Sequence, residues 1–344
     1  MSKPDLFALP VHDRDLARLE ACLKDSVLGD DQFLNEVAGH LIAAGGKRLR
    51  PSLTIMAPML AGKEVDEAIL LGGVSVELVH LASLYHDDVM DEATRRRGVE
   101  SVNARWGNLI AIVAGDFLLA RSAEIAASLG TEVAGLLAAT LARLCQGQVS
   151  EVRAAFQIDR TEPDYLQAIS DKTAALMGTA CRIGALCSGL DPATTDGLTA
   201  FGEAFGMVFQ IRDDVLDVIA TEEELGKAPG QDLVEGIYTL PVQRALADRV
   251  VGPRLASLLG QPLTDEEKET ARHLVASSPG VSSAAEVARD YANRAVKAAL
   301  EIDDVATGGL AAIPEALAEM AMLAVSDLEE SAARARSRSQ ALAG

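Results

Sequence analysis

Apolar residues recur every three or four positions along almost the whole chain, and no other feature restricts the possible folds as strongly. One such stripe holds Leu16, Leu19, Leu23 and Val27. Positions that are three and four residues apart share one face of an α-helix. No stretch of useful length alternates apolar and polar residues as a half-buried strand does. The sequence therefore predicts an all-α fold, built as a single large helical bundle.

Glycine and proline divide this pattern into separate helices. Gly45 and Gly46, for instance, stop one helix, and Pro51 suits the first turn of the next. No low-complexity linker cuts the sequence, so residues 1–344 are predicted to form one domain. About twelve residues at the amino end and about ten at the carboxyl end are expected to be loose. Helices are predicted over residues 13–27, 31–44, 52–60, 65–90, 108–128, 131–157, 164–189, 195–219, 241–248, 265–277, 282–302 and 313–335, with an acidic, glycine-rich loop over 221–238.

The charge balance limits the possible partners. Asp and Glu total 51 against 31 Lys and Arg, which gives a net charge of −20. No nucleic-acid partner is expected, because phosphate backbones bind basic surfaces. No signal peptide is visible, and no uncharged run approaches the ~18 apolar residues of a transmembrane helix. A soluble, cytoplasmic protein with no transmembrane segment is therefore expected, and its 4 cysteines are predicted to be reduced core residues.

Two acidic motifs of identical spacing end two of the apolar segments. Within each motif, aspartates at positions i and i+4 share a helix face and direct two carboxylates the same way. Such oxygen ligands favour Mg²⁺, which proteins usually hold through one or two carboxylates together with substrate phosphates. Acidic residues on helices are mostly solvated, but both motifs follow core-forming segments, which favours a metal site. The aspartates are Asp87, Asp88 and Asp91 in the first motif, and Asp213, Asp214 and Asp217 in the second.

Short basic motifs stand out against this acidic background. Any one of them alone is most simply read as ordinary surface charge. Together they offer guanidinium forks, ammonium groups and a hydroxyl, which are the donors that two diphosphates need. The motifs are residues 46–50 (GKRLR), residues 95–98 (RRRG), Lys172-Thr173, and Lys227 in the acidic loop.

With these motifs in place, the sequence resembles the trans-isoprenyl diphosphate synthases, also called the polyprenyl synthetase family. The matching stretches keep the family's order and spacing and span nearly the whole chain. The resemblance implies an isoprenoid-synthase bundle around a central apolar cavity. It also implies a Mg²⁺-dependent prenyltransferase that condenses isopentenyl diphosphate with an allylic diphosphate. The stretches are residues 45–51 (GGKRLRP), 80–98 (HLASLYHDDVMDEATRRRG), 115–116 (GD), 172–173 (KT), 209–217 (FQIRDDVLD), 226–227 (GK) and 232–241 (DLVEGIYTLP).

Carried over residue by residue, the resemblance assigns roles to both sets of motifs. The six aspartates would hold Mg²⁺, and five of them, Asp87, Asp88, Asp91, Asp213 and Asp214, would be catalytic together with Lys172. The allylic diphosphate would contact Arg96, Lys172, Thr173, Gln210 and Lys227. Isopentenyl diphosphate would contact Lys47, Arg50, His80 and Arg97. A histidine on an apolar helix is more often an ordinary core residue, which is the alternative for His80 and the interpretation kept for His40 and His86.

The chain departs from the family pattern at two places. Ile237 stands where many members have a lysine, so one diphosphate contact of that loop is either missing or supplied by Lys227 alone. Residues 331–344 lack the aspartate-arginine ending of many members, which puts closure of the tail over the isopentenyl site in doubt.

Product length depends on the space beneath the first acidic motif. About one turn before Asp87 lie Ala82 and Ser83, both small, where short-chain members often carry bulky aromatic residues. A long-chain product, about the length of a quinone side chain, is therefore predicted, and Ala82→Phe is expected to shorten it. Tyr85 lies closer to the motif, and the sequence does not settle the direction of its ring.

Three alternatives remain at this point: a short-chain farnesyl or geranylgeranyl synthase, a non-catalytic subunit of a heteromeric synthase, and a terpene cyclase. The six aspartates argue against a non-catalytic subunit. A cyclase would carry an Asn/Ser/Glu-type second motif. Residues 106–120 are apolar with few charges, and residues 133–142 are apolar around the whole helix and are predicted to be buried. These two segments favour a homodimer.

Overall fold

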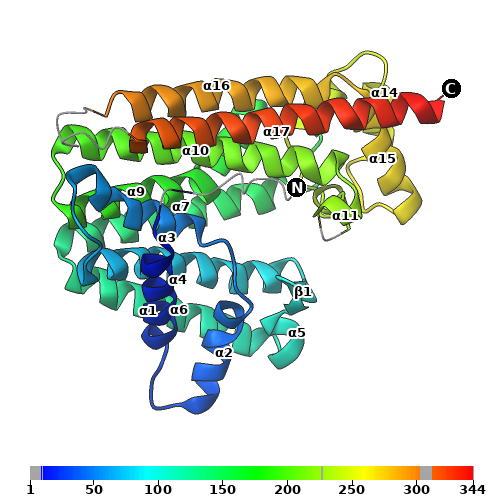
Figure 1. Cartoon of the computed structure of the whole chain (residues 1–344). Helices are drawn as coiled ribbons and strands as arrows, with labels where there is room; N and C mark the ends of the chain where they lie inside the picture. Colours follow the sequence, from blue (N-terminus) through cyan, green and yellow to red (C-terminus); the bar gives the residue numbers. More distant parts are fainter. Residues whose placement is uncertain (1–8, 10, 226–227, 303–311, 344) are drawn as a thin grey trace.

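The structure is a computed structural model that describes residue 9 and residues 11–225, 228–302 and 312–343. Within these ranges the chain is helical apart from one short two-stranded hairpin. The all-α prediction is therefore confirmed. The longest helices lie side by side, and α1 (Asp13–Ser26) and α2 (Gln32–Ala43) cover one end of the stack (Figure 1).

Helix α4 (Glu67–Met90) is the centre of the bundle. It is buried around most of its circumference, because it contributes to two hydrophobic clusters. Val76 and Val79 belong to the larger cluster, whereas Leu78 and Leu81 belong to the second. A helix with core on both sides is apolar all round, and for that reason its sequence shows no single stripe. Its packing partners are α3 (Leu49–Met56), α6 (Asn108–Ser128) and α9 (Ala175–Ser188).

Helix α4 bears on the expectation that the chain has no transmembrane segment. By length and composition it is apolar enough to cross a membrane. The single acid Glu77 interrupts the run without lowering its mean hydropathy enough to fail that criterion. Of its most apolar window, 72% is buried inside the molecule, which is the environment of a core helix enclosed by other helices.

The opposite side of the bundle is built on α10 (Pro192–Ile219), which packs against α9, α16 (Gly280–Leu300) and α17 (Ala312–Ala343). The side chain of Asp191 caps α10 by accepting from the backbone N–H groups of Ala193 at 2.9 Å and Thr194 at 3.1 Å. With Pro192 in the first turn, the helix begins three residues before the predicted start at Thr195. Helix α17 continues to Ala343 and so includes most of the residues expected to be loose at the carboxyl end.

A wide helical turn interrupts the single helix that was predicted over residues 164–189. Helix α8 (Glu162–Ile169) passes into a π-helical segment, η2 (Ser170–Ala174), and then into α9. Two neighbouring helices approach this turn closely through glycine. A Cβ at Gly147 would lie 2.7 Å from the backbone nitrogen of Lys172, and one at Gly206 would lie 2.5 Å from the Cα of Ala174. Both glycines are therefore required for this packing.

The hairpin was not predicted, because each strand has only two residues. Strand β1 (Arg95–Arg96) pairs antiparallel with β2 (Val99–Glu100). The two connecting residues, Arg97 and Gly98, have φ angles of 52° and 79°. Positive φ at both positions is the geometry of the tight turns that match the twist of a hairpin. The hairpin places the three arginines beside the end of α4.

The remaining elements are shorter or end differently from the prediction. Helix α7 ends at Ala154 rather than at residue 157. The cysteines are all free thiols, but Cys145 is exposed on α7 and is not a core residue as was predicted. The twelve amino-terminal residues lie largely outside the described part. The other elements are η1 (Ala57–Ala61), α5 (Val102–Trp106), α7 (Thr131–Ala154), α11 (Glu222–Leu225), α12 (Gln231–Val234), α13 (Leu240–Leu246), α14 (Gly252–Leu258) and α15 (Asp265–Ser277).

One face of α6 and α7 is apolar and exposed in the single chain. On α6, the exposed fractions of Leu109 and Val113 are 73% and 52%. On α7, Ala138 and Ala142 are exposed, so the prediction that residues 133–142 are buried on all sides is wrong for one chain alone. An apolar surface of this kind on neighbouring helices is typical of an interface.

Candidate active site

The two acidic motifs meet at one side of the bundle. The carboxyl ends of α4 and α10 both lie near the hairpin and α11 (Figure 1). A cleft of ≈ 930 Å³ opens between them and is lined by Asp87 and Asp91 from the first motif and by Asp214 from the second. Arg96, Lys172, Thr173 and Gln210 line the same cleft. Lys227, also predicted for this site, lies outside the described residues.

Asp214 is held by a network of neutral donors. The hydroxyl of Tyr165 donates to its Oδ2 at 2.5 Å, and the amide of Gln210 donates to its Oδ1 at 2.7 Å. The hydroxyl of Thr173 in turn donates to the amide oxygen of Gln210 at 2.7 Å. Burial raises the pKa of Asp214 to about 7, although both hydrogen bonds act in the opposite direction. No motif or spacing in the sequence pointed to Tyr165, which is a buried aromatic residue on α8.

Asp87 and Asp91 lie close to Lys172 in the cleft. Burial raises the pKa of Asp87 to about 6, while the nearby ammonium group of Lys172 acts to lower it. Burial likewise raises the pKa of Asp91. Lys172 forms an ion pair with Glu151 of α7, a cleft residue that the sequence analysis missed. This pairing fixes the ammonium group between the first acidic motif and α7.

The other three aspartates of the motifs do not line the cleft. Asp88 is fully buried and accepts from Arg96, whose Nε and Nη2 lie 2.7 Å and 2.6 Å from its Oδ1. Asp213 points partly to solvent and lies close enough to Arg50 to affect the pKa of that residue. Asp217 accepts from the backbone N–H of Asp232 at 3.3 Å. The face of α10 that lines the cleft is thus the one shared by Gln210 and Asp214.

A second, smaller pocket of ≈ 210 Å³ adjoins the cleft. It gathers the residues that the resemblance assigned to isopentenyl diphosphate: Lys47, Arg50, His80 and Arg97. Arg97 also lines the cleft, so it connects the two hollows. Burial, followed by the positive charges of Arg50 and Arg97, holds the pKa of His80 well below its usual value. His80 is therefore a neutral imidazole among cations and not an isolated core residue.

Two residues that the sequence analysis did not assign organise this pocket. Glu77 of α4 is 2% exposed, and its Oε1 lies 3.0 Å from Nη1 of Arg48 and 4.0 Å from Nη2 of Arg97. A buried carboxylate surrounded by arginines keeps their like charges together. Arg48 and Arg97 both have left-handed backbones, with φ angles of 49° and 52°, a strained conformation that is common at functional sites.

The glycine and histidine motifs near the site have structural roles. A Cβ at Gly115 would lie 2.3 Å from Nε2 of His86, so only glycine leaves room for that ring. His86 also lies 3.2 Å from the carbonyl oxygen of Ile112 and 3.5 Å from Asp116. Tyr85 points away from the cleft, and its hydroxyl donates to the carbonyl oxygen of Val37 at 2.7 Å. His40 lies 2.7 Å from the carbonyl oxygen of Glu100 in the hairpin.

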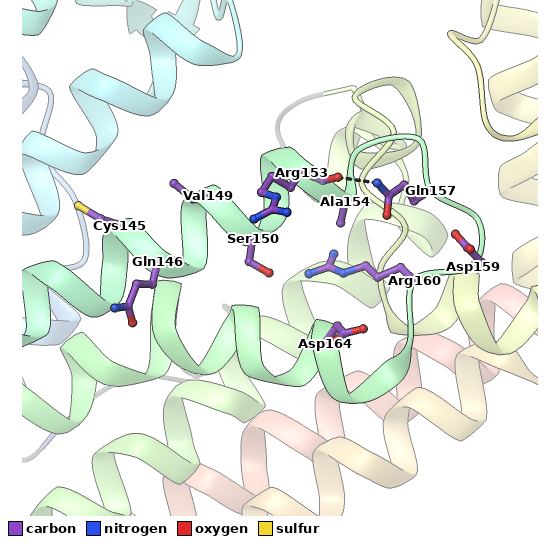
Figure 2. A pocket seen from close by; sticks show the side chains of 10 residues that line it. All are labelled: Cys145, Gln146, Val149, Ser150, Arg153, Ala154, Gln157, Asp159, Arg160 and Asp164. Carbon is purple, nitrogen blue, oxygen red and sulfur yellow. Dashed lines mark hydrogen bonds between the residues drawn. The ribbon is translucent and has the colours of Figure 1, made fainter.

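A further hollow of ≈ 610 Å³ lies between α7 and the loop before α8. Figure 2 shows Ser150 and Arg153 on the α7 side and Arg160 reaching across from the loop. This hollow holds none of the predicted site residues. Among the described residues, Arg160 is the one that lines both this hollow and the active-site cleft.

The carboxylates of the cleft fit a divalent cation. Burial raises the pKa values of Asp87 and Asp214, and a divalent cation bound between them would favour their ionised forms. In the part of the chain that the structure describes, no three metal-ligating side chains converge on one point. This donor set suits Mg²⁺, which takes one or two carboxylates and completes its shell with water and phosphate oxygens.

Comparison with known proteins identifies the class. The polyprenyl synthetase family model matches residues 31–275. The nonaprenyl diphosphate synthase of Mycobacterium tuberculosis is 39% identical over 81% of this chain and 84% of its own. The heptaprenyl diphosphate synthase component 2 of Geobacillus stearothermophilus is 40% identical over 71% and 76%.

A solved structure agrees with these relatives. The polyprenyl synthase from Caulobacter crescentus, in complex with calcium and isoprenyl diphosphate, has a TM-score of 0.83 at 34% identity and covers 91% of this chain and 95% of its own. An all-α bundle with two facing acidic helix ends thus defines an isoprenyl diphosphate synthase fold. The chain belongs to the polyprenyl synthetase family and is a prenyltransferase.

The raised pKa values predict how divalent ions bind at different pH. Metal ligation requires ionised carboxylates, so affinity for Mg²⁺ or Ca²⁺ should increase from about pH 5.5 to about pH 7.5. Over the same interval the metal-free protein should lose stability. The native state there holds protons on Asp87 and Asp214 that the unfolded chain, with pKa values near 4, has already released.

Thermal unfolding with and without the metal at both pH values measures these two effects. The variant Asp214→Asn, which has no carboxylate to ionise, should show a weaker pH dependence than the wild type. A metal-induced increase in Tm that is equal at the two pH values would contradict the prediction.

Proposed function

We propose that this protein condenses isopentenyl diphosphate with an allylic diphosphate to make an all-trans polyprenyl diphosphate, with Mg²⁺ as its cofactor. The observation that carries the proposal is the arrangement of two adjacent hollows of opposite character. A cleft lined by Asp87, Asp91 and Asp214 adjoins a pocket lined by Lys47, Arg50 and Arg97. Two diphosphate substrates with different needs for metal suit such a pair.

In this proposal the cleft takes the allylic diphosphate. Mg²⁺ supplies the charge neutralisation that lets the diphosphate leave. Arg96, which Asp88 holds in place, offers its guanidinium group from the hairpin, and Lys172 adds a point charge that Glu151 holds. Donors fixed in advance in this way stabilise the negative charge that develops on the leaving group.

The basic pocket takes isopentenyl diphosphate. Lys47, Arg48, Arg50 and Arg97 line it, and the ion pair of Glu77 with Arg48 limits the repulsion among these four cations. Neutral His80 can donate one hydrogen bond without adding charge. The double bond then attacks the allylic carbocation at the junction of the two hollows, and the departed diphosphate accepts the proton that is lost. No nucleophilic serine or cysteine is needed for these steps.

Turnover of labelled isopentenyl diphosphate tests the proposal directly. With Mg²⁺ and an allylic primer the wild type should form extended prenyl diphosphates, and chelation of the metal should stop the reaction. Asp87→Asn should lower turnover roughly a hundredfold or more, because it weakens metal and leaving-group stabilisation. Asp159→Asn, outside the cleft, is the matched control.

An inactive wild type would refute the proposed function. It would then favour the rival proposal of a non-catalytic subunit, to which the component 2 relative points by its name alone. In that case, activity would appear only after a second component was added.

For product length we propose a long chain. Tyr85 points toward α2 and so does not obstruct the space below the cleft. Ser83 is half-buried and donates to the carbonyl oxygen of His80 at 2.8 Å, which keeps its small side chain against its own helix. Ala82 is fully buried and packs in the second hydrophobic cluster with Tyr85 and Leu118. A short-chain synthase is the alternative.

Bulky replacements near the first motif test the proposed length. Ser83→Phe should shorten the product distribution on reversed-phase chromatography, because its ring would enter the space below Asp87. Ala82→Phe should shorten it as well, with an additional loss of stability of about 1–3 kcal/mol from overpacking the buried site. Leu28→Phe, on an exposed residue, is the control. An unchanged distribution in both variants would remove the argument for length control at this position.

We also propose a homodimer that covers the exposed face of α6 and α7. Leu109, Ile112 and Val113 provide large apolar side chains, and Ala138 and Ala142 allow close approach of a second helix. Light scattering at micromolar concentration should give twice the monomer mass for the wild type. Val113→Glu should shift this mass toward the monomer, whereas Val250→Glu, on a distant exposed residue, should leave it unchanged. A monomeric wild type would contradict the proposal.

A further inference from the structure

Arg160, in the loop before α8, has buried donors that no protein group satisfies. Its Nε and Nη2 atoms are buried, and neither has a hydrogen-bond partner among the described residues. Leaving buried donors without acceptors costs free energy, and this is rare enough in folded proteins to call for a cause. Arg160 borders both the active-site cleft and the hollow beside α7, which Figure 2 shows.

The neighbouring cations of the cleft differ from Arg160. Arg96 is paired with Asp88, and Lys172 is paired with Glu151. Each of these cations is fixed by a carboxylate before any substrate binds. Arg160 stands in an acidic cleft and forms no ion pair of this kind with a described residue, so its guanidinium group keeps its capacity for an external anion.

Arg160 lies beside the wall of the cleft that α8 and α10 form. The guanidinium carbon lies 5.7 Å from the ring centre of Tyr165, whose hydroxyl donates to Asp214. Gln210 and Thr173 continue the same wall through hydrogen bonds of 2.7 Å. Arg96 enters the cleft from the hairpin, next to the first acidic motif. The two arginines thus approach the cleft from different walls.

The loop around Ile237 explains why a cation is useful here. The backbone N–H of Phe156 donates to the carbonyl oxygen of Gly236 at 2.9 Å, so the segment that carries Arg160 packs against this loop. Ile237 itself lines the cleft but offers no charge. Among the described residues that line the cleft, Arg160 brings positive charge to this part of the wall.

We propose that Arg160 binds the diphosphate of the allylic substrate, together with Arg96, which enters the cleft from a different element. This inference rests on the proposed function. The planar fork of arginine matches two phosphate oxygens, and its unpartnered Nε and Nη2 are a suitable donor pair. Arg160 is a binding residue for the leaving group and takes no part in proton transfer.

Steady-state kinetics on the full-length protein test this inference. Arg160→Gln should raise KM for the allylic diphosphate roughly tenfold or more, and should raise the inhibition constant of inorganic diphosphate with Mg²⁺ by a similar factor. KM for isopentenyl diphosphate should change little. Arg160→Lys should retain part of the affinity. The control Arg153→Gln removes an arginine that borders only the outer hollow.

A second variant separates charge from position. Adding Ile237→Lys to the Arg160→Gln protein should restore much of the affinity for inorganic diphosphate, because it returns a cation to the same wall. If Arg160→Gln leaves both constants unchanged, or if the added lysine restores nothing, the diphosphate contact is refuted. A wild type that turns over substrate while Arg160→Gln is unaffected refutes only this inference, whereas an inactive wild type refutes the proposed function.

Discussion

The active site depends on carboxylates that stand at the carboxyl ends of two helices, where the helix dipole is already negative. Asp87 and Asp88 occupy the last turn of α4, and Asp91 is its C-cap residue. Such placement is unfavourable without compensating positive charge. Arg96 supplies part of it by binding Asp88. At the end of α10, Arg272 donates to the carbonyl oxygens of Val218 at 3.2 Å and Ala220 at 2.8 Å.

These arginines do not neutralise all of the negative charge at the two helix ends. The negative charge that remains defines the function of the cleft. Arg272 binds the carbonyl oxygens at the end of α10, and Arg96 binds Asp88. In contrast, Asp87, Asp91 and Asp214 line the cleft, and burial raises their pKa values. The apolar core around α4 and α10 fixes both helix ends and prevents these carboxylates from moving apart. The cost of holding them together is offset when a divalent cation binds.

Much of this arrangement could be predicted from the sequence, because the motifs are local. Asp87 and Asp91, four residues apart, both line the cleft as the helical period requires. The residues that position the motifs could not be found in this way. Tyr165, Glu151 and Glu77 act through contacts with residues 49, 21 and 29 positions away in the chain. No periodic pattern or spacing reports such long-range pairs.

The packing of the helices was the other feature that could not be predicted from the sequence. Periodicity predicted that Asp213 and Asp217 share a face, but it did not show that the cleft would meet the adjacent face, with Gln210 and Asp214. The rotation of α10 about its own axis decides which face turns toward the cleft, and that rotation depends on packing across the core. The π-helical turn at Lys172 has the same origin, since close approach at Gly147 shapes it.

The two hollows also differ in when their charge becomes available. The basic pocket holds its cations permanently, because Glu77 is buried among them and neutral His80 adds no charge. In the proposed function, divalent ions would add the positive charge that the acidic cleft needs to attract a diphosphate. In the proposed reaction, binding of the allylic diphosphate would therefore depend mainly on the metal, whereas isopentenyl diphosphate would bind to the protein itself. Arg97 borders both hollows, and in the proposed reaction the new bond would form at their junction.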